Sequence, residues 1–67
     1  MNHAVRTFKP NGTLIYEDKF ETAEQAYEEY CDIIDNLTKN LPKGQIVIVA
    51  RFNNNRMMTQ QTITGRV

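Results

Sequence analysis

Several residue types are scarce or missing in this sequence, and each shortage narrows the chemistry available to it. There is no serine, which excludes a Ser-His-Asp catalytic set. The single cysteine, Cys31, allows neither an internal disulfide nor a cysteine-based zinc cage. The three glycines stand apart at positions 12, 44 and 65, so no glycine-rich loop can cradle a phosphate. We therefore expect no enzymatic activity, no catalytic residue, no cofactor and no metal site.

Long apolar runs are also missing. No stretch approaches the ~20 apolar residues of a membrane span. The opening residues, Met-Asn-His-Ala-Val-Arg, lack the basic and apolar regions of a secretory signal peptide. A lone cysteine is typical of a reducing compartment. These features predict a cytoplasmic protein with no membrane partner.

The size of the chain predicts one small domain over residues 1–67, with a mass of 7.8 kDa. Below ~70–80 residues, a single apolar core supplies only a few kcal/mol of stability. Burial of a surface against another chain is one way to add to it. This makes a protein partner, or a second copy of the chain in a homodimer, an expected feature.

The first third of the chain reads as a β-hairpin. Residues 2–9 and 13–20 carry β-favouring side chains. Between them, Pro10-Asn11-Gly12 is a strong turn signal, because proline presets φ and glycine accepts positive φ.

A helix is predicted to follow over residues 23–38. Thr22 is a suitable N-cap, and Gln25 completes a capping-box pattern. The segment has no glycine or proline, and we expect it to end near Asn40, before Pro42. One apolar stripe runs along it, formed by Ala23, Ala26, Tyr27, Tyr30, Ile33, Ile34 and Leu37.

The last third reads as a second hairpin, with strands at 45–52 and 56–66 around the polar loop 53–55. The first of these strands holds five consecutive apolar residues, Ile46 to Ala50, which is typical of burial on both faces. The whole chain therefore predicts an α+β fold in the order ββαββ. Its four-stranded, mainly antiparallel sheet has one helix packed on one face, and the strand order stays open.

Strand alternation divides the apolar side chains between two sheet faces. We expect the helix to cover the face that carries Leu14, Tyr16, Phe20, Ile46 and Ile48. Phe52 shares the parity of Ile46 and Ile48, so it is expected to pack in the same core rather than to form a base-stacking platform. Val47 and Val49 would then lie on the uncovered face, where a partner or a second copy could bind.

Charge is segregated along the chain although the formal net charge is zero. All eight acidic residues lie between Glu17 and Asp35, and seven of the eight basic residues lie outside that window. The segregation fits a protein partner of complementary charge. It also leaves open a small nucleic-acid-binding domain that uses the basic strands at 45–66, although a pI of about 6.5 is low for such binders.

The leading hypothesis is a non-enzymatic protein-interaction module, and the nucleic-acid-binding domain is the alternative. A hydrolase or transferase subunit is a distant third. In size and composition the chain resembles the very small single-domain proteins of phages and other mobile elements, which implies a regulator or inhibitor that binds a larger protein. The predicted partner-binding residues are Val47, Val49, Arg51, Arg56, Glu28 and Asp32.

Overall fold

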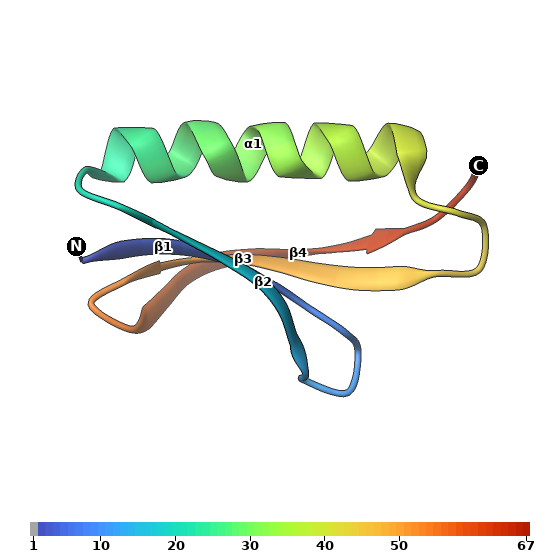
Figure 1. Ribbon diagram of the computed structural model, residues 1–67, viewed down its shortest axis with the longest axis horizontal. Helices are drawn as coiled ribbons and strands as arrows, with labels where there is room; N and C mark the ends of the chain where they lie inside the picture. Colours follow the sequence, from blue (N-terminus) through green and yellow to red (C-terminus); the bar gives the residue numbers. More distant parts are fainter. Residues whose placement is uncertain (1) are drawn as a thin grey trace.

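The computed structural model describes residues 2–67 and has one helix lying across one face of a single sheet (Figure 1). This confirms the predicted α+β fold and its ββαββ order. The elements are β1 (His3–Phe8), β2 (Leu14–Phe20), α1 (Ala23–Asn40), β3 (Ile46–Asn53) and β4 (Arg56–Thr64).

The sheet has the strand order β2-β1-β3-β4, and all neighbouring strands are antiparallel. The two hairpins therefore meet through β1 and β3, which pair from His3 opposite Asn53 to Phe8 opposite Ile48. This central pairing joins the first hairpin to the second, and it leaves β2 and β4 as the edges of the sheet.

The first turn has the conformation that its sequence predicts. Gly12 has a φ of 91°, in the left-handed region that glycine adopts without penalty. The Asn11 side chain closes the turn locally, because its Oδ1 accepts a hydrogen bond of 2.9 Å from the Thr13 N–H.

The second turn depends on two asparagines. Asn54 and Asn55 have φ values of 53° and 64°, and positive φ at both positions is the geometry of a type I′ hairpin turn. Asparagine tolerates this region better than most residues with a Cβ. The turn is tied to the start of the chain, since the Asn54 N–H donates a 2.7 Å hydrogen bond to the Asn2 carbonyl.

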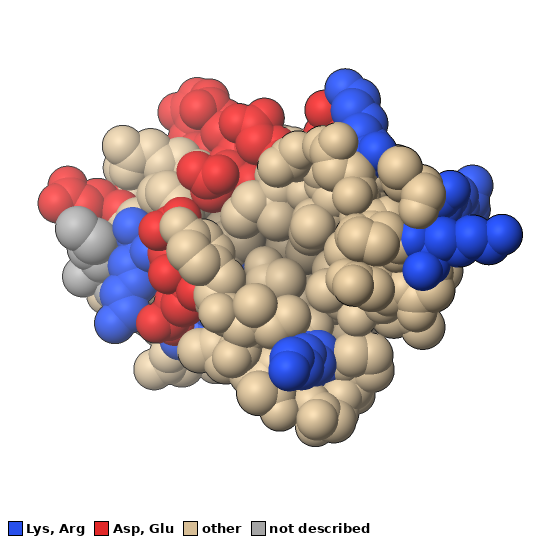
Figure 2. All heavy atoms as spheres, turned by 45° about the vertical axis from the view of Figure 1, so that its right-hand side comes forward, with Lys and Arg blue, Asp and Glu red and all other residues tan. Residues whose placement is uncertain are grey.

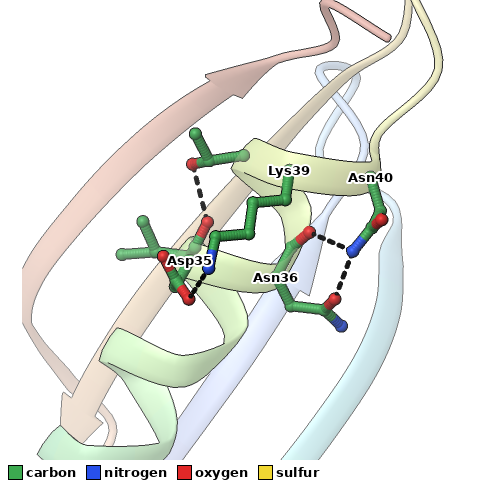
Figure 3. A network of polar contacts seen from close by, with 6 residues as sticks. Asp35, Asn36, Lys39 and Asn40 are labelled. Carbon is green, nitrogen blue, oxygen red and sulfur yellow. Dashed lines mark hydrogen bonds and ion pairs between the residues drawn. The ribbon is translucent and has the colours of Figure 1, made fainter.

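Helix α1 begins as predicted, with the Thr22 hydroxyl accepting from the Gln25 N–H at 3.2 Å. At its other end it extends two residues beyond the predicted span, to Asn40. There the Asn40 side-chain amide donates to the Asn36 carbonyl at 3.0 Å, within a network of polar contacts around the last turn (Figure 3). Asn40 does not have a positive φ, and the C-cap residue is Leu41, immediately before Pro42.

The assignment of the two sheet faces from sequence was wrong. Val47 and Val49 are 8% and 0% exposed, and they lie in the core beneath α1. Ile46 and Ile48 have the opposite parity and belong to the face without a helix. The residues of the core beneath α1 are Val5, Ala26, Tyr30, Leu41, Val47, Val49 and Ile63.

The ion pair between Arg6 and Glu17 favours this choice of face. Arg6 on β1 lies opposite Ala50 on one side and opposite Glu17 on the other, so the parity of Ile46 and Ile48 also carries an ion pair. Placing that pair under a helix would cost the desolvation of both charges. The opposite face of the sheet carries Val5 on β1, and Ile63 on β4 lies there opposite Val47. These apolar side chains can be buried beneath the helix without the desolvation of a charge.

A β-bulge changes the parity within β2. The β1–β2 register shifts between Thr7 and Phe8, so that Tyr16 lies opposite Thr7 but Leu14 lies opposite Phe8. Tyr16 and Phe20 lie on the helix side as predicted, and Phe20 packs against the core. Leu14 was expected to share their face, but beyond the bulge it pairs with Phe8, which packs against the open-face residues.

Candidate functional site

The six predicted partner-binding residues do not form one site. Val47 and Val49 are inside the core and cannot contact a partner in this fold. Arg51 is half-buried on the helix side, where its guanidinium carbon lies 5.8 Å from the centroid of the Tyr27 ring. Arg56 is exposed at the start of β4, beside the second turn. The basic residues of the last two strands therefore do not make a continuous stripe.

Glu28 and Asp32 are the predicted residues that the structure brings together. Both are exposed and lie one turn apart on α1. They border a hollow of about 450 Å³ between the helix and the end of β2. Its other lining residues are Lys19, Phe20, Glu21, Gln25 and Glu29. The arrangement is an acidic surface with one lysine, and its role in binding stays a prediction.

The open face of the sheet holds a second, smaller apolar cluster, formed by Ala4, Ala50 and Phe52 with Phe8 packed against them. The Phe52 ring meets Phe8 edge to face, with the two centroids 6.4 Å apart. Phe52 was expected beneath the helix, and its position here is a correction. Since it is only 9% exposed, its ring face is not available as a stacking platform.

An apolar groove, which the sequence did not reveal, runs along the β1–β2 hairpin, from α1 at one end to the first turn and the start of β3 at the other. It consists of two adjoining hollows of about 540 and 280 Å³, and Ile15 lines both. The larger lies against the first turn and the start of β3, and is also lined by Ile46 and Val47. The smaller lies against the helix, where Ile33 and Leu37 contribute.

The groove exists because the hairpin diverges from the helix. Figure 1 shows β2 and the first turn bending away from α1. As a result, Ile33 and Leu37 remain only partly buried, although they belong to the apolar stripe of the helix. Ile15 and Tyr16, on the diverging strand, are 49% and 54% exposed.

The two ends of this groove differ in charge. Asp18 and Glu29 border the smaller hollow, and Lys9 borders the larger one. The Tyr16 hydroxyl donates a 3.1 Å hydrogen bond to Asp18, and this bond, together with the charges of Asp18 and Glu29, raises the pKa of Tyr16. Figure 2 shows an uncharged, hollowed surface, with acidic residues above it and to its left and with basic residues to its right, below it and beside the acidic residues on the left.

Sequence reasoning missed the groove for an identifiable reason. Strict alternation placed Ile15 on the face opposite Tyr16, whereas the bulge lets both line the smaller hollow. The run Leu14-Ile15-Tyr16, in a strand next to a turn, was the sequence feature that could have indicated the bulge. Simple alternation does not account for three successive large apolar residues.

Other potential chemical groups are dispersed. Cys31 is exposed, and its thiol, which contacts the Tyr27 hydroxyl, raises the pKa of that tyrosine. Within residues 2–67, no group of three or more His, Cys, Asp or Glu side chains is arranged to hold a metal ion. In the same range, no helix combines the length and apolar character needed to cross a membrane.

Comparison with known proteins adds no relative: no family model, curated protein or solved structure matches the chain.

Proposed function

We propose that this chain is a non-catalytic protein-binding module, and that the groove along the β1–β2 hairpin receives an apolar segment of a larger protein. The observation that carries the proposal is the exposure of large apolar side chains around one concave surface. Ile15, Tyr16 and Ile46 are each between 43% and 54% exposed there. Contiguous exposed apolar surface of this kind marks binding sites in small proteins.

The lining favours a protein segment over a nucleic acid. A nucleic-acid strand is held mainly through its phosphates by basic residues. Here, Asp18 and Glu29 border the part of the groove nearest the helix, and they would repel phosphates. A peptide with apolar side chains at its centre and a basic residue near one end satisfies both the groove and its acidic border.

The mode of action that we propose is regulation or inhibition of the bound protein. A chain of 67 residues with no catalytic set acts on a larger partner by occupying or covering part of its surface. The resemblance in size and composition to the small proteins of phages and mobile elements supports this role. We propose a cytoplasmic location on the same basis as the sequence prediction.

The test is capture of the partner followed by measurement of its affinity for matched variants. After a partner is captured from native lysate and purified, its Kd is measured for the parent, for Ile15→Ser and for Met58→Ser. Met58 is as exposed as Ile15, at 49%, but lies on β4. We expect Ile15→Ser to weaken binding by more than about tenfold, the equivalent of ~1.4 kcal/mol, and Met58→Ser to leave it unchanged.

Two results would contradict the proposal. If both variants bind the partner as the parent does, the groove is not the binding site. If the chain is instead retained on a phosphate-bearing resin in a salt-sensitive way, and loses that retention in Arg51→Gln or Arg56→Gln, the nucleic-acid alternative is favoured.

A further inference from the structure

We infer that β4 is a pairing edge, and that it joins a second copy of this chain to form one continuous eight-stranded sheet. The inference does not depend on the proposed function, because neither hollow of the groove is lined by a residue of β4. It concerns a different surface from the predicted homodimer interface at Val47 and Val49, which is inside the core.

The two edges of the sheet differ in how they are protected. An exposed edge strand presents unpaired backbone N–H and C=O groups, and natural proteins block such edges with charges, prolines or bulges. On β2, three consecutive charged residues, Glu17, Asp18 and Lys19, follow a bulge. This edge has the usual protection against pairing with another strand.

β4 lacks that protection over most of its length. Residues 57–64 contain no charged residue, proline or glycine, and four of them are β-branched: Thr59, Thr62, Ile63 and Thr64. Its bulge lies near the start, opposite Arg51 and Phe52. From Thr59 to Thr64 the strand stays in continuous register with β3, which makes its outer edge regular.

The exposed side chains of β4 favour an identical strand as the partner. In antiparallel pairing about a two-fold axis normal to the sheet, opposite residues lie on the same face. A register that places Gln61 opposite its own copy pairs residues 59–63 with one another, and within that span no charge lies opposite another charge. Gln60 and Gln61, both exposed near the middle of the strand, would lie close to the axis, where amide side chains can pair with each other.

The rest of the molecule permits this arrangement. The symmetry places both helices on the same face of the extended sheet. Acidic residues gather on the β2 side, where Glu28, Glu29 and Asp32 line the hollow at the end of β2. Pairing at β4 therefore keeps the two acidic surfaces apart, so that their repulsion does not oppose association.

The experiment measures the mass of the full chain by light scattering and sedimentation over a wide range of concentration. For the parent, we expect the mass to rise from 7.8 kDa toward twice that value. The double variant Gln60→Lys/Thr62→Lys places charges on the edge and should remain at the mass of one chain. The matched control Gln25→Lys/Thr13→Lys changes the same residue types at exposed sites away from β4, and it should associate as the parent does.

Amide hydrogen exchange and one further variant separate edge pairing from packing of the open faces. Edge pairing should slow exchange in residues 59–64 as the concentration rises, and Ile46→Lys, at an exposed site on β3, should leave association unchanged. Circular dichroism checks that each variant is folded. The inference is overturned if the parent keeps the mass of one chain at every concentration. It is also overturned if Ile46→Lys abolishes association while the folded β4 variant retains it.

Discussion

The guanidinium carbon of Arg6 lies 4.4 Å from the centroid of the Phe52 ring, on the face of the sheet that the helix leaves open. The same side chain forms an ion pair with Glu17 on β2 and donates a 3.1 Å hydrogen bond to Asn55 in the second turn. Arg6 thus covers an aromatic ring and connects both hairpins. This explains how Phe52 can be only 9% exposed on a face with no covering element.

Removal of this cover should destabilise the fold. We expect Arg6→Ala to lower the free energy of unfolding by about 1–2 kcal/mol, through loss of the cation–π contact and of the partly shielded ion pair. Urea denaturation followed by circular dichroism measures the change. The control Arg56→Ala removes an exposed arginine near the same turn and should change stability by less than about 0.5 kcal/mol. Equal effects of the two variants would show that Arg6 has no covering role.

The ion pair should also give a defined dependence on pH. The hydrogen bond from Arg6 is the main cause that lowers the pKa of Glu17 below its ordinary value of 4.5. Because the folded-state pKa is the lower one, the stabilisation is present above about pH 4.5 and is lost as pH falls through the folded-state value.

Glu17→Gln should therefore be less stable than the parent near neutral pH, and the difference should shrink to nothing in acid. Thermal unfolding at a series of pH values measures it, with Glu28→Gln on the exposed helix surface as the control. A difference between Glu17→Gln and the parent that persists unchanged into strong acid would assign the effect to packing rather than to charge.

The core position of Val49 leads to a distinct prediction. A lysine at this fully buried site would place an unpaired charge beneath α1. We expect Val49→Lys to cost about 4 kcal/mol or more, enough to unfold most molecules of so small a protein. Ile46→Lys, on the same strand but 43% exposed, should stay folded. One-dimensional NMR spectra distinguish the folded from the unfolded variant. A Val49→Lys variant that folds would contradict the burial of Val49 in the core.

Gly65 is required by a close contact rather than by its backbone angles. A Cβ at this position would lie 1.8 Å from the Pro42 carbonyl oxygen, while the Gly65 N–H already donates a 2.7 Å bond to Gln45. Gly65→Ala should therefore displace the tail from the 41–45 loop, at a cost of about 1–3 kcal/mol. Chemical-shift changes in the loop should accompany the loss of stability. A variant that matches the parent in both would show that the tail has room to move.

The sequence by itself determined the elements and their order. The N-cap Thr22, the turn glycine Gly12 and the apolar spacing along the helix are local signals, and each is set by residues within a few positions of one another. Such signals survive in any tertiary arrangement. They were therefore sufficient for the ββαββ order and for most element boundaries to within one or two residues.

Only the tertiary structure decided which face of the sheet meets the helix. Strand alternation places Val47 and Val49 on one face and Ile46 and Ile48 on the other. Both pairs are equally apolar, so the sequence of β3 alone does not show which face the helix covers. The choice of face depends on residues of other strands: the Arg6–Glu17 ion pair lies on the open face, and Val5 and Ile63 lie on the face beneath the helix. Those partners meet only once β1 pairs with β3, a contact between strands far apart in the sequence that no local pattern encodes.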